Sequence, residues 1–260
     1  MKHKPKLGQH LLTDKRLLEH LVALCQINPN STLIEIGPGK GALTQFLVHQ
    51  SPDVHLIELD QAFFNNLQTR YANWSVNIHH IDILKFNWST IPSDKLHIVG
   101  NLPYYISSPI LLQMIALRER IHQLNFMLQL EVAQRLVAQP GNKSYGRLSI
   151  LIQTFFTSTI LMELSENLFT PPPKVRSAFI EMSPIEPLLP NQAITMLETI
   201  TQHAFGQRRK KIRNALQQLL IDEDWEKLAI ENDQRAGDLS VDDYHRICRY
   251  LLEKQSSNRI

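Results

Sequence analysis

Cysteine is scarce in this 260-residue chain, and its two cysteines, Cys25 and Cys248, stand far apart in the sequence. They form no metal-ligand or redox spacing, so we expect reduced thiols and a cytoplasmic protein. No apolar run approaches the roughly 20 residues that span a bilayer. The basic start, residues 1–6, is not followed by the apolar core of a secretory signal. We therefore expect neither a membrane protein nor a secreted, disulfide-rich one.

Other signatures are missing as well. The chain has no internal repeat and no low-complexity tract. His79 and His80 are adjacent but have no cysteine or carboxylate at ligand spacing, so we predict no metal site. A dinucleotide-binding enzyme would carry Gly-x-Gly-x-x-Gly, whereas the glycines at 37, 39 and 41 follow Gly-x-Gly-x-Gly. A nicotinamide cofactor therefore fits poorly.

What the chain does contain is an alternation of short β-rich and helical runs. Expected strands cover residues 32–36, 54–59, 76–81, 96–99 and 125–130, separated by helical patterns near residues 41–50, 61–70 and 109–118. A helical pattern near residues 147–156 precedes two further β-rich runs, residues 159–164 and 178–182. This alternation is typical of α/β proteins. We predict a Rossmann-like, seven-stranded, mostly parallel sheet with helices on both faces.

A proline-marked stretch, residues 184–190, has the composition of a linker. Beyond it the pattern is helical at residues 192–204, 207–220, 223–229 and 241–253, and Ser240 with Asp243 forms a near capping box before the last of these. We therefore predict a catalytic α/β domain over residues 1–185 and a small helical domain over residues 186–260.

The most specific segment is Asn101-Leu102-Pro103-Tyr104, which directly follows an apolar expected strand. Open α/β sheets place their chemistry at the carboxyl ends of strands. An aromatic amine could donate to the Asn101 amide oxygen and the Leu102 carbonyl while its ring stacks on Tyr104. A plain strand-to-helix turn with Tyr104 in the core would carry the same residues, so the segment alone leaves both interpretations open.

Polar features also end the three expected strands that precede this segment. The backbone at Gly37 and Gly39 can approach a ligand closely. Glu58 can accept both hydroxyls of a ribose, and Asp82 can accept a hydrogen bond from an adenine amine. Either acid alone could be a solvated strand-end carboxylate. Their occurrence on consecutive strand ends favours a shared ligand site.

These motifs resemble the motif series of class I S-adenosylmethionine-dependent methyltransferases. Three further segments narrow the match to the bacterial ribosomal RNA small subunit adenine dimethyltransferase (KsgA) family, which the chain resembles from about residue 4 to residue 252. They are Leu7-Gly8-Gln9-His10-Leu11-Leu12, Phe169-Thr170-Pro171-Pro172-Pro173-Lys174-Val175 and Gln207-Arg208-Arg209-Lys210-Lys211-Ile212-Arg213-Asn214. Two departures are Tyr105, where the family commonly has Asn, and Leu11, where Phe is commoner.

The resemblance implies S-adenosylmethionine as methyl donor, and it implies cofactor contacts from His10, Leu12, Gly37, Gly39, Glu58, Asp82 and Asn101. It also implies dimethylation of two adjacent adenosines near the 3′ end of 16S rRNA, within a maturing small ribosomal subunit. We expect Asn101 and Leu102 to bind the target amine, and Tyr104 and Phe169 to stack on opposite faces of the extruded base. Phe169 could instead be a loop hydrophobe packed against the sheet. We expect a monomer.

Cations are concentrated in one later segment of a chain whose net charge is only +2. They are Arg208, Arg209, Lys210, Lys211 and Arg213, and no acidic residue occurs between positions 207 and 220. A helix over residues 207–220 would pack its apolar face on the domain while these cations meet phosphates. A solvated basic face is the alternative.

Two rival functions remain open from the sequence. One is a related erythromycin-resistance methyltransferase that acts on large-subunit rRNA, although the basic segment and the Phe-Thr-Pro-Pro-Pro loop argue against it. The other is a binding protein that checks ribosome assembly, for which methylation is secondary.

Overall fold

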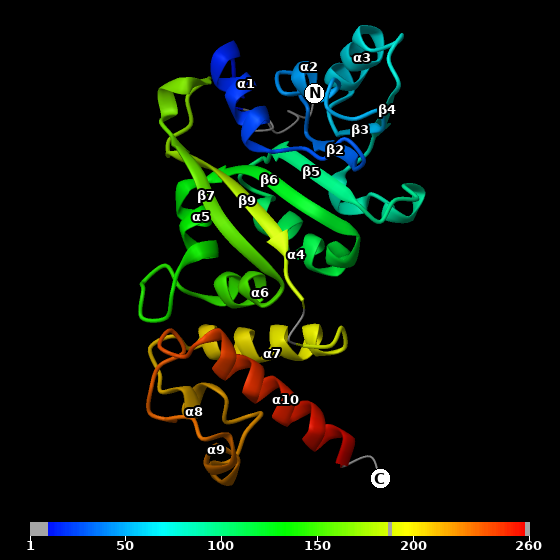
Figure 1. Cartoon of the computed structure of the whole chain (residues 1–260). Helices are drawn as coiled ribbons and strands as arrows, with labels where there is room; N and C mark the ends of the chain where they lie inside the picture. The colour runs from blue at the N-terminus through cyan, green and yellow to red at the C-terminus, as the bar shows by residue number, and fades with distance from the viewer. Residues whose placement is uncertain (1–9, 187–188, 258–260) are drawn as a thin grey trace, which may run out of the picture. The chain divides into compact units, whose positions relative to one another are not determined.

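The computed structural model describes residues 10–186 and 189–257. The chain forms two compact units (Figure 1). The first combines Met1–Ala133 with Ser158–Pro184, and the second combines Gln134–Thr157 with Ile185–Ile260. The segment Gln134–Thr157 thus clusters with the second unit, whereas the division drawn from the sequence assigned it to the first domain. The catalytic and rRNA-binding roles of the two domains stay predictions.

A seven-stranded sheet runs through the first unit in the order β4-β3-β2-β5-β6-β9-β7. Neighbours from β4 to β6 pair in parallel, and β9 pairs antiparallel with β6. This confirms the predicted mostly parallel sheet. The strands are β2 (Thr32–Ile36), β3 (Val54–Glu58), β4 (Val76–His80), β5 (Leu96–Asn101), β6 (Ile121–Gln129), β7 (Phe156–Leu164) and β9 (Ser177–Pro184).

Helices cover both faces of the central strands, since every residue of β2 and of β3 is buried. Helix α3 begins where the Asp60 carboxylate caps it, accepting from the backbone N–H groups of Ala62 and Phe63 at 2.8 and 3.2 Å. The helices that begin in this unit are α1 (Lys15–Leu24), α2 (Thr44–Leu47), α3 (Gln61–Arg70), α4 (Ser107–Leu117) and α5 (Leu130–Val137).

A two-stranded antiparallel sheet joins distant parts of the same unit. Strand β1 (Leu11–Leu12) pairs with β8 (Phe169–Thr170), so that Leu12 lies opposite Phe169. The segment that begins at His10 is thereby fixed next to the proline-rich loop.

The second unit is helical, as predicted. Its helices are α6 (Arg147–Phe155), α7 (Ala193–Gly206), α8 (Ile212–Ala215), α9 (Asp222–Leu228) and α10 (Val241–Ser257). The predicted capping box before α10 is confirmed: the backbone N–H of Ser240 donates to Asp243 at 2.8 Å, and that of Asp243 donates to the Ser240 hydroxyl at 3.1 Å.

The predicted helix over residues 207–220 is wrong, because only the four residues of α8 are helical there. The backbone N–H of Ile212 donates to the Gln234 carbonyl at 2.7 Å, and that of Arg213 to the Asn232 carbonyl at 3.3 Å. In a continuous helix these two N–H groups would instead donate to the carbonyls of the residues four positions earlier in the chain. Pairing with a distant segment therefore replaces the first turns of the helix. Among the described residues, no helix combines the length and apolar character needed to cross a membrane.

Candidate active site

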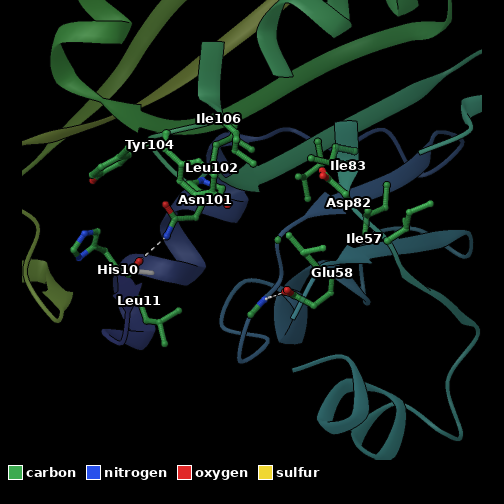
Figure 2. Close-up of a pocket in the computed structure, with 17 residues that line it drawn as sticks. His10, Leu11, Ile57, Glu58, Asp82, Ile83, Asn101, Leu102, Tyr104 and Ile106 are labelled. Carbon is green, nitrogen blue, oxygen red and sulfur yellow. Dashed lines mark hydrogen bonds between the residues drawn. The ribbon is translucent and has the colours of Figure 1, made fainter. Parts of the chain in front are cut away.

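A pocket lies at the carboxyl ends of the parallel strands in the first unit (Figure 2). Its walls come from the turn after β2, the end of β3, the segment after β4, the segment after β5 and the residues next to β1. Most of the predicted site residues line it, namely His10, Gly37, Gly39, Glu58, Asp82, Asn101, Leu102 and Tyr104. The shared sheet edge thus brings together residues that are far apart in the sequence.

The turn after β2 places backbone close to the pocket. Gly37 and Gly39 have φ values of 67° and 56°, in the region that favours glycine. A Cβ atom built on Gly37 would meet no atom within 4 Å, which leaves open space beside the turn. A Cβ on Gly39 would lie 3.5 Å from the side chain of Leu11. The turn is therefore a bare backbone surface that faces the ligand site.

Glu58 is fixed at the end of β3 with only 3% of its surface exposed. One carboxylate oxygen accepts from the Gly39 N–H at 2.9 Å, and the other accepts from the Asp60 N–H at 2.7 Å. Burial raises the pKa of Glu58, and these backbone hydrogen bonds oppose that rise. A carboxylate has about four acceptor positions, so Glu58 keeps capacity to accept from a ligand hydroxyl.

Glu35, in β2, is a second buried acid near the turn. The Thr44 hydroxyl donates to it at 2.6 Å, and only 2% of its surface is exposed. Burial raises the pKa of Glu35 to about 8, and the charge of Glu58 adds to this rise. Glu35 is therefore mainly protonated at pH 7, which limits the buried negative charge beneath the turn. The sequence motif contained Glu35, but its neutral state depends on burial that the motif does not show.

Asp82 caps a short 3-10 helix and also faces the pocket (Figure 2). One of its carboxylate oxygens accepts from the backbone N–H of Leu84 at 3.0 Å. Within the described part of the chain, the other oxygen accepts no hydrogen bond. It is available to an amine of a ligand, and the predicted contact with adenine stays a prediction.

Asn101 has one amide end tethered and one end free. Its Nδ2 donates to the backbone carbonyl of His10 at 2.9 Å (Figure 2), and because a carbonyl can only accept, this contact fixes the orientation of the amide. Among the residues that the structure describes, neither the Asn101 Oδ1 nor the Leu102 carbonyl accepts a hydrogen bond. The two oxygens are adjacent along the chain in a pocket-lining segment. This pair suits an amine donor.

Tyr104 presents a fixed ring beside these oxygens. Its hydroxyl is hydrogen-bonded to the Ser177 hydroxyl at 2.7 Å, and its ring stacks on that of His10 with a centroid distance of 5.7 Å and an interplanar angle of 28°. The Nδ1 of His10 donates to the Pro171 carbonyl at 2.7 Å. Both rings are thus held by hydrogen bonds to other segments.

Two predicted site residues do not reach the pocket. Leu12 and Phe169 face each other in the β1–β8 pair, with 3% and 2% of their surfaces exposed, and both belong to the hydrophobic core. The structure thus shows the alternative for Phe169, a hydrophobic residue packed in the core. Stacking on a base would require its ring to leave that core. Leu11, the neighbour of Leu12 on the opposite side of the strand, lines the pocket instead.

Other contributors to the site were not assigned to it from the sequence. Tyr105 and Leu59 line the pocket although 59% and 45% of their surfaces are exposed. Large hydrophobic side chains that are exposed at a pocket indicate a ligand-binding surface, and the sequence does not show which side chains are exposed. Gly100 is another, since a Cβ there would lie 2.7 Å from the Ile36 carbonyl oxygen. Only glycine lets β5 approach β2 closely enough at the residue before Asn101.

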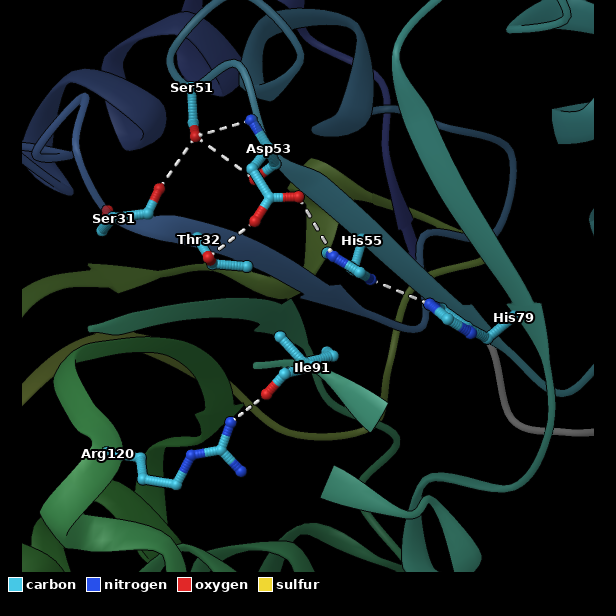
Figure 3. Close-up of polar contacts among 8 residues, drawn as sticks. All are labelled: Ser31, Thr32, Ser51, Asp53, His55, His79, Ile91 and Arg120. Carbon is cyan, nitrogen blue, oxygen red and sulfur yellow. Dashed lines mark hydrogen bonds and ion pairs between the residues drawn. The ribbon is translucent and has the colours of Figure 1, made fainter. Parts of the chain in front are cut away.

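A separate polar network joins the beginnings of β2 and β3 to β4 (Figure 3). Asp53 accepts from the Thr32 hydroxyl at 2.7 Å and lies 3.2 Å from His55 Nε2. The second nitrogen of His55 lies 2.9 Å from His79 Nε2. Burial and the neighbouring His55 lower the pKa of His79. His79 therefore links β4 to β3 through its contact with His55. Among the described residues, no group of three or more histidine, cysteine, aspartate or glutamate side chains could hold a metal ion.

The five predicted RNA-binding cations, Arg208, Arg209, Lys210, Lys211 and Arg213, are all exposed in the second unit. The Arg208 guanidinium donates to the carbonyls of Lys143 and Tyr145 at 2.6 and 3.0 Å. Arg208, Arg209, Lys143 and Arg235 line one shallow hollow, together with Asp238. Of the five predicted cations, Arg208 and Arg209 thus share this hollow, whereas the Lys211 ammonium lies 3.8 Å from the Asp233 carboxylate. Their contact with rRNA stays a prediction.

Comparisons with known proteins agree over almost the whole chain. The family model described as ribosomal RNA adenine dimethylase matches residues 1–253. A ribosomal RNA small subunit methyltransferase A from Herminiimonas arsenicoxydans is 39% identical over 256 residues, which cover 96% of this chain and 100% of that protein.

Two solved structures have the same fold. A dimethyladenosine transferase from Plasmodium falciparum matches with a TM-score of 0.82 and 23% identity, covering 95% of this chain and 98% of the other. The 23S rRNA methyltransferase ErmE matches with a TM-score of 0.71 and 22% identity, covering 93% and 99%. At these identities the two structures show the fold alone.

Proposed function

Because the chain belongs to the ribosomal RNA adenine dimethylase family, we propose that it dimethylates the exocyclic amines of two adjacent adenosines near the 3′ end of 16S rRNA. The chain is an enzyme with the methyltransferase fold. The observation that carries the proposal is the pair of free oxygens at Asn101 and Leu102, beside the fixed ring of Tyr104.

The proposed methyl donor is S-adenosylmethionine, and the residues of the pocket fit it. The unused lone pairs of Glu58 suit the two ribose hydroxyls, and the free oxygen of Asp82 suits the adenine amine. The open space beside Gly37 lets a ligand approach the backbone. When bound, S-adenosylmethionine supplies an electrophilic methyl group on a cationic sulfonium.

The target amine needs activation more than it needs deprotonation. The lone pair of an exocyclic adenine amine is delocalised into the ring, which makes the nitrogen a poor nucleophile. Two hydrogen bonds from this amine, to the Asn101 Oδ1 and the Leu102 carbonyl, favour a tetrahedral nitrogen with a localised lone pair. The amine becomes acidic only after it is methylated, so the site requires no strong general base.

The same acceptors permit a second transfer to the same nitrogen. A singly methylated amine keeps one N–H group, which needs only one of the two oxygens. The Asn101 amide stays oriented throughout, because its tether is the backbone carbonyl of His10 and not the substrate.

The remaining parts of the proposal concern the partner. The exposed cations at 208–211 and 213 contact rRNA phosphates in the immature small ribosomal subunit. The enzyme acts as a monomer, and it acts in the cytoplasm, as expected from the sparse cysteines.

The test uses the purified protein, labelled S-adenosylmethionine and small ribosomal subunits from cells that lack this methylation. Mass spectrometry of rRNA fragments should find two methyl groups on each of two adjacent adenosines near the 3′ end of 16S rRNA. Large subunits from the same cells are the control. Label in 23S rRNA instead would favour the erythromycin-resistance type of enzyme, and no label in either RNA would reject the proposal.

A further inference from the structure

The glycine turn after β2 is held by the last turn of helix α3. The Arg70 guanidinium donates to the backbone carbonyl of Lys40, the residue after Gly39, at 3.3 Å. A Cβ atom built on Gly41 would lie 3.3 Å from the Leu67 side chain and 3.4 Å from Arg70 Nη1. Helix α3 therefore packs directly against the end of this turn and donates a hydrogen bond to it.

The segment that carries Glu58 is held in a matching way by His80, the last residue of β4. The Nε2 atom of His80 lies 3.0 Å from the backbone carbonyl of Leu59, and because a carbonyl can only accept, this nitrogen donates. The His80 ring also stacks on the ring of Phe64 in α3, with a centroid distance of 4.9 Å and an interplanar angle of 29°. Two contacts thus fix the orientation of the His80 ring.

These two contacts flank one hydrogen bond of the pocket. The backbone N–H of Gly39 donates to the Glu58 carboxylate at 2.9 Å, and Figure 2 shows this bond at Glu58. Arg70 holds the residue that follows Gly39, and His80 holds the residue that follows Glu58. Both Arg70 and His80 lie outside the set of residues that line the pocket. They act on the backbone of the site and not on its contents.

We infer that Arg70 and His80 are positioning residues, which hold the Glu58 carboxylate where it accepts the two ribose hydroxyls of the methyl donor. The inference rests on the proposed function, which assigns the ribose to Glu58. Without these two donors, the backbone segments that carry Gly39 and Glu58 gain conformational freedom. Ligand binding must then restrict that freedom, which lowers the affinity.

Two double variants separate the hydrogen bonds from the shape of the side chains. The donor-free variant, Arg70→Met with His80→Phe, keeps a long side chain at the turn and an aromatic ring on Phe64. The donor-retaining variant, Arg70→Lys with His80→Gln, keeps an N–H donor at both positions. Gln68→Met, at an exposed position of α3, is the matched control. Calorimetric titration with S-adenosylhomocysteine measures the affinity of each protein, and urea unfolding measures its stability.

The donor-free variant should bind S-adenosylhomocysteine about 10-fold more weakly than wild type, the effect of losing two net hydrogen bonds. The donor-retaining variant should stay within about threefold, and Gln68→Met should bind like wild type. In methylation assays with small ribosomal subunits, the KM for S-adenosylmethionine should rise in the donor-free variant. Its kcat at saturating S-adenosylmethionine should be retained, because the target amine meets Asn101 and Leu102 and not Glu58.

The same changes in a Glu58→Ala background test whether Arg70 and His80 act through Glu58. In that background, losing both donors should change the affinity less than about twofold, since the ribose acceptor is already absent. An undiminished loss there would overturn the inference. So would an unchanged affinity in the donor-free variant, or an equal loss in the donor-retaining variant, which assigns the effect to side-chain shape.

If the donor-free variant does not unfold cooperatively in urea, Arg70→Met and His80→Phe are measured singly. Each should then weaken S-adenosylhomocysteine binding roughly threefold, and wild-type affinity in both would overturn the inference. A wild-type protein that binds S-adenosylhomocysteine but methylates no rRNA would instead reject the proposed function.

Discussion

The pocket of the first unit and the basic surface of the second are built in different ways. In the pocket, Glu58 ends β3, Asn101 ends β5 and Asp82 follows β4 by two residues, so the strand order of one sheet determines their positions. On the basic surface, Arg208, Arg209 and Lys210 lie outside helices and strands, and the backbone that follows them is held by long-range contacts such as the one from Ile212 to Gln234. In both regions the sequence identified the residue types of the site. It predicted their positions in space only where the motif directly follows a strand.

The charged side chains of the two regions also differ in their exposure to solvent. Glu58 is buried, and its carboxylate is held by backbone N–H groups, whereas Arg209 and Lys210 are exposed to solvent. Buried groups are screened little by salt, and exposed cations that bind phosphates are screened strongly. Substitutions in the pocket should therefore change chemistry and leave subunit affinity intact, and substitutions on the surface should do the reverse.

The largest effect is expected from Asn101→Ala. Loss of the amide oxygen removes one of two acceptors for the target amine, and we expect kcat to fall by roughly 1000-fold, as for other oriented polar groups at reacting centres. Subunit binding should stay within about twofold, as measured by filtration. Asn77→Ala, at an exposed position on β4, is the matched control. Turnover near wild type would remove Asn101 from the mechanism, and normal subunit maturation without methyl groups would favour the assembly-checking role.

Glu58→Ala should weaken cofactor binding by about 100-fold. Two charge-assisted hydrogen bonds to ribose hydroxyls are lost, and the Gly39 N–H loses its acceptor at the same time. Calorimetric titration with S-adenosylhomocysteine measures this change directly. Glu19→Ala, at an exposed position of α1, should bind like wild type. An unaltered affinity in Glu58→Ala would count against the ribose contact.

The buried acid Glu35 predicts a pH dependence of stability that the basic surface does not share. Its pKa is about 8 in the folded protein and close to 4.5 when unfolded, so between these values the folded state binds more protons. Stability from Glu35 is therefore present at low pH and is lost as the pH rises toward 8. Relative to Glu35→Gln, wild type should lose about 2 kcal/mol in free energy of unfolding between pH 5 and 7.

Urea unfolding of both proteins at pH 5, 6 and 7 tests this prediction. The comparison with Glu35→Gln is needed because burial lowers the pKa of His97 to about 4, which has the opposite effect on stability over the same range. Since His97 is common to both proteins, its contribution cancels. Parallel pH profiles for the two proteins would show that Glu35 is charged in the folded state.

The smallest effect is expected on the basic surface. The double variant Arg209→Ala and Lys210→Ala should bind the small subunit about 10-fold more weakly, because two phosphate contacts are lost. The slope of log affinity against log salt should become shallower by between one and two. Lys95→Ala, an exposed cation in the first unit, is the control and should change neither quantity. A salt slope identical to wild type would assign Arg209 and Lys210 to solvent.

Several elements were predictable from the sequence to the residue. Strand β2 has the predicted bounds because an apolar run ends at a glycine turn, and α3 has them because Asp60 caps its first residues. Local signals at both ends sufficed in these cases. The helix over residues 207–220 failed because its backbone pairs with residues 232–234, and no local pattern records that partner.

The site shows the same limit. Glu58, Asp82 and Asn101 were identified from strand ends and occupy the pocket. Phe169 was expected there because it precedes a stiff proline run, but the β1–β8 pair joins it to Leu12 across more than 150 residues and places it in the core. That pairing was not visible in the sequence, and neither was the contact between His10 and Asn101.

The anchor of the Asn101 amide is an atom that every amino acid carries, the main-chain oxygen at position 10. Substitutions at position 10 leave this carbonyl in place, so a substitution scan will not detect the loss of activity that removing the carbonyl would cause. Inserting or removing a single residue between position 10 and the start of α1 would pull it out of reach. Short indels, rather than substitutions, are therefore the way to map this part of the enzyme.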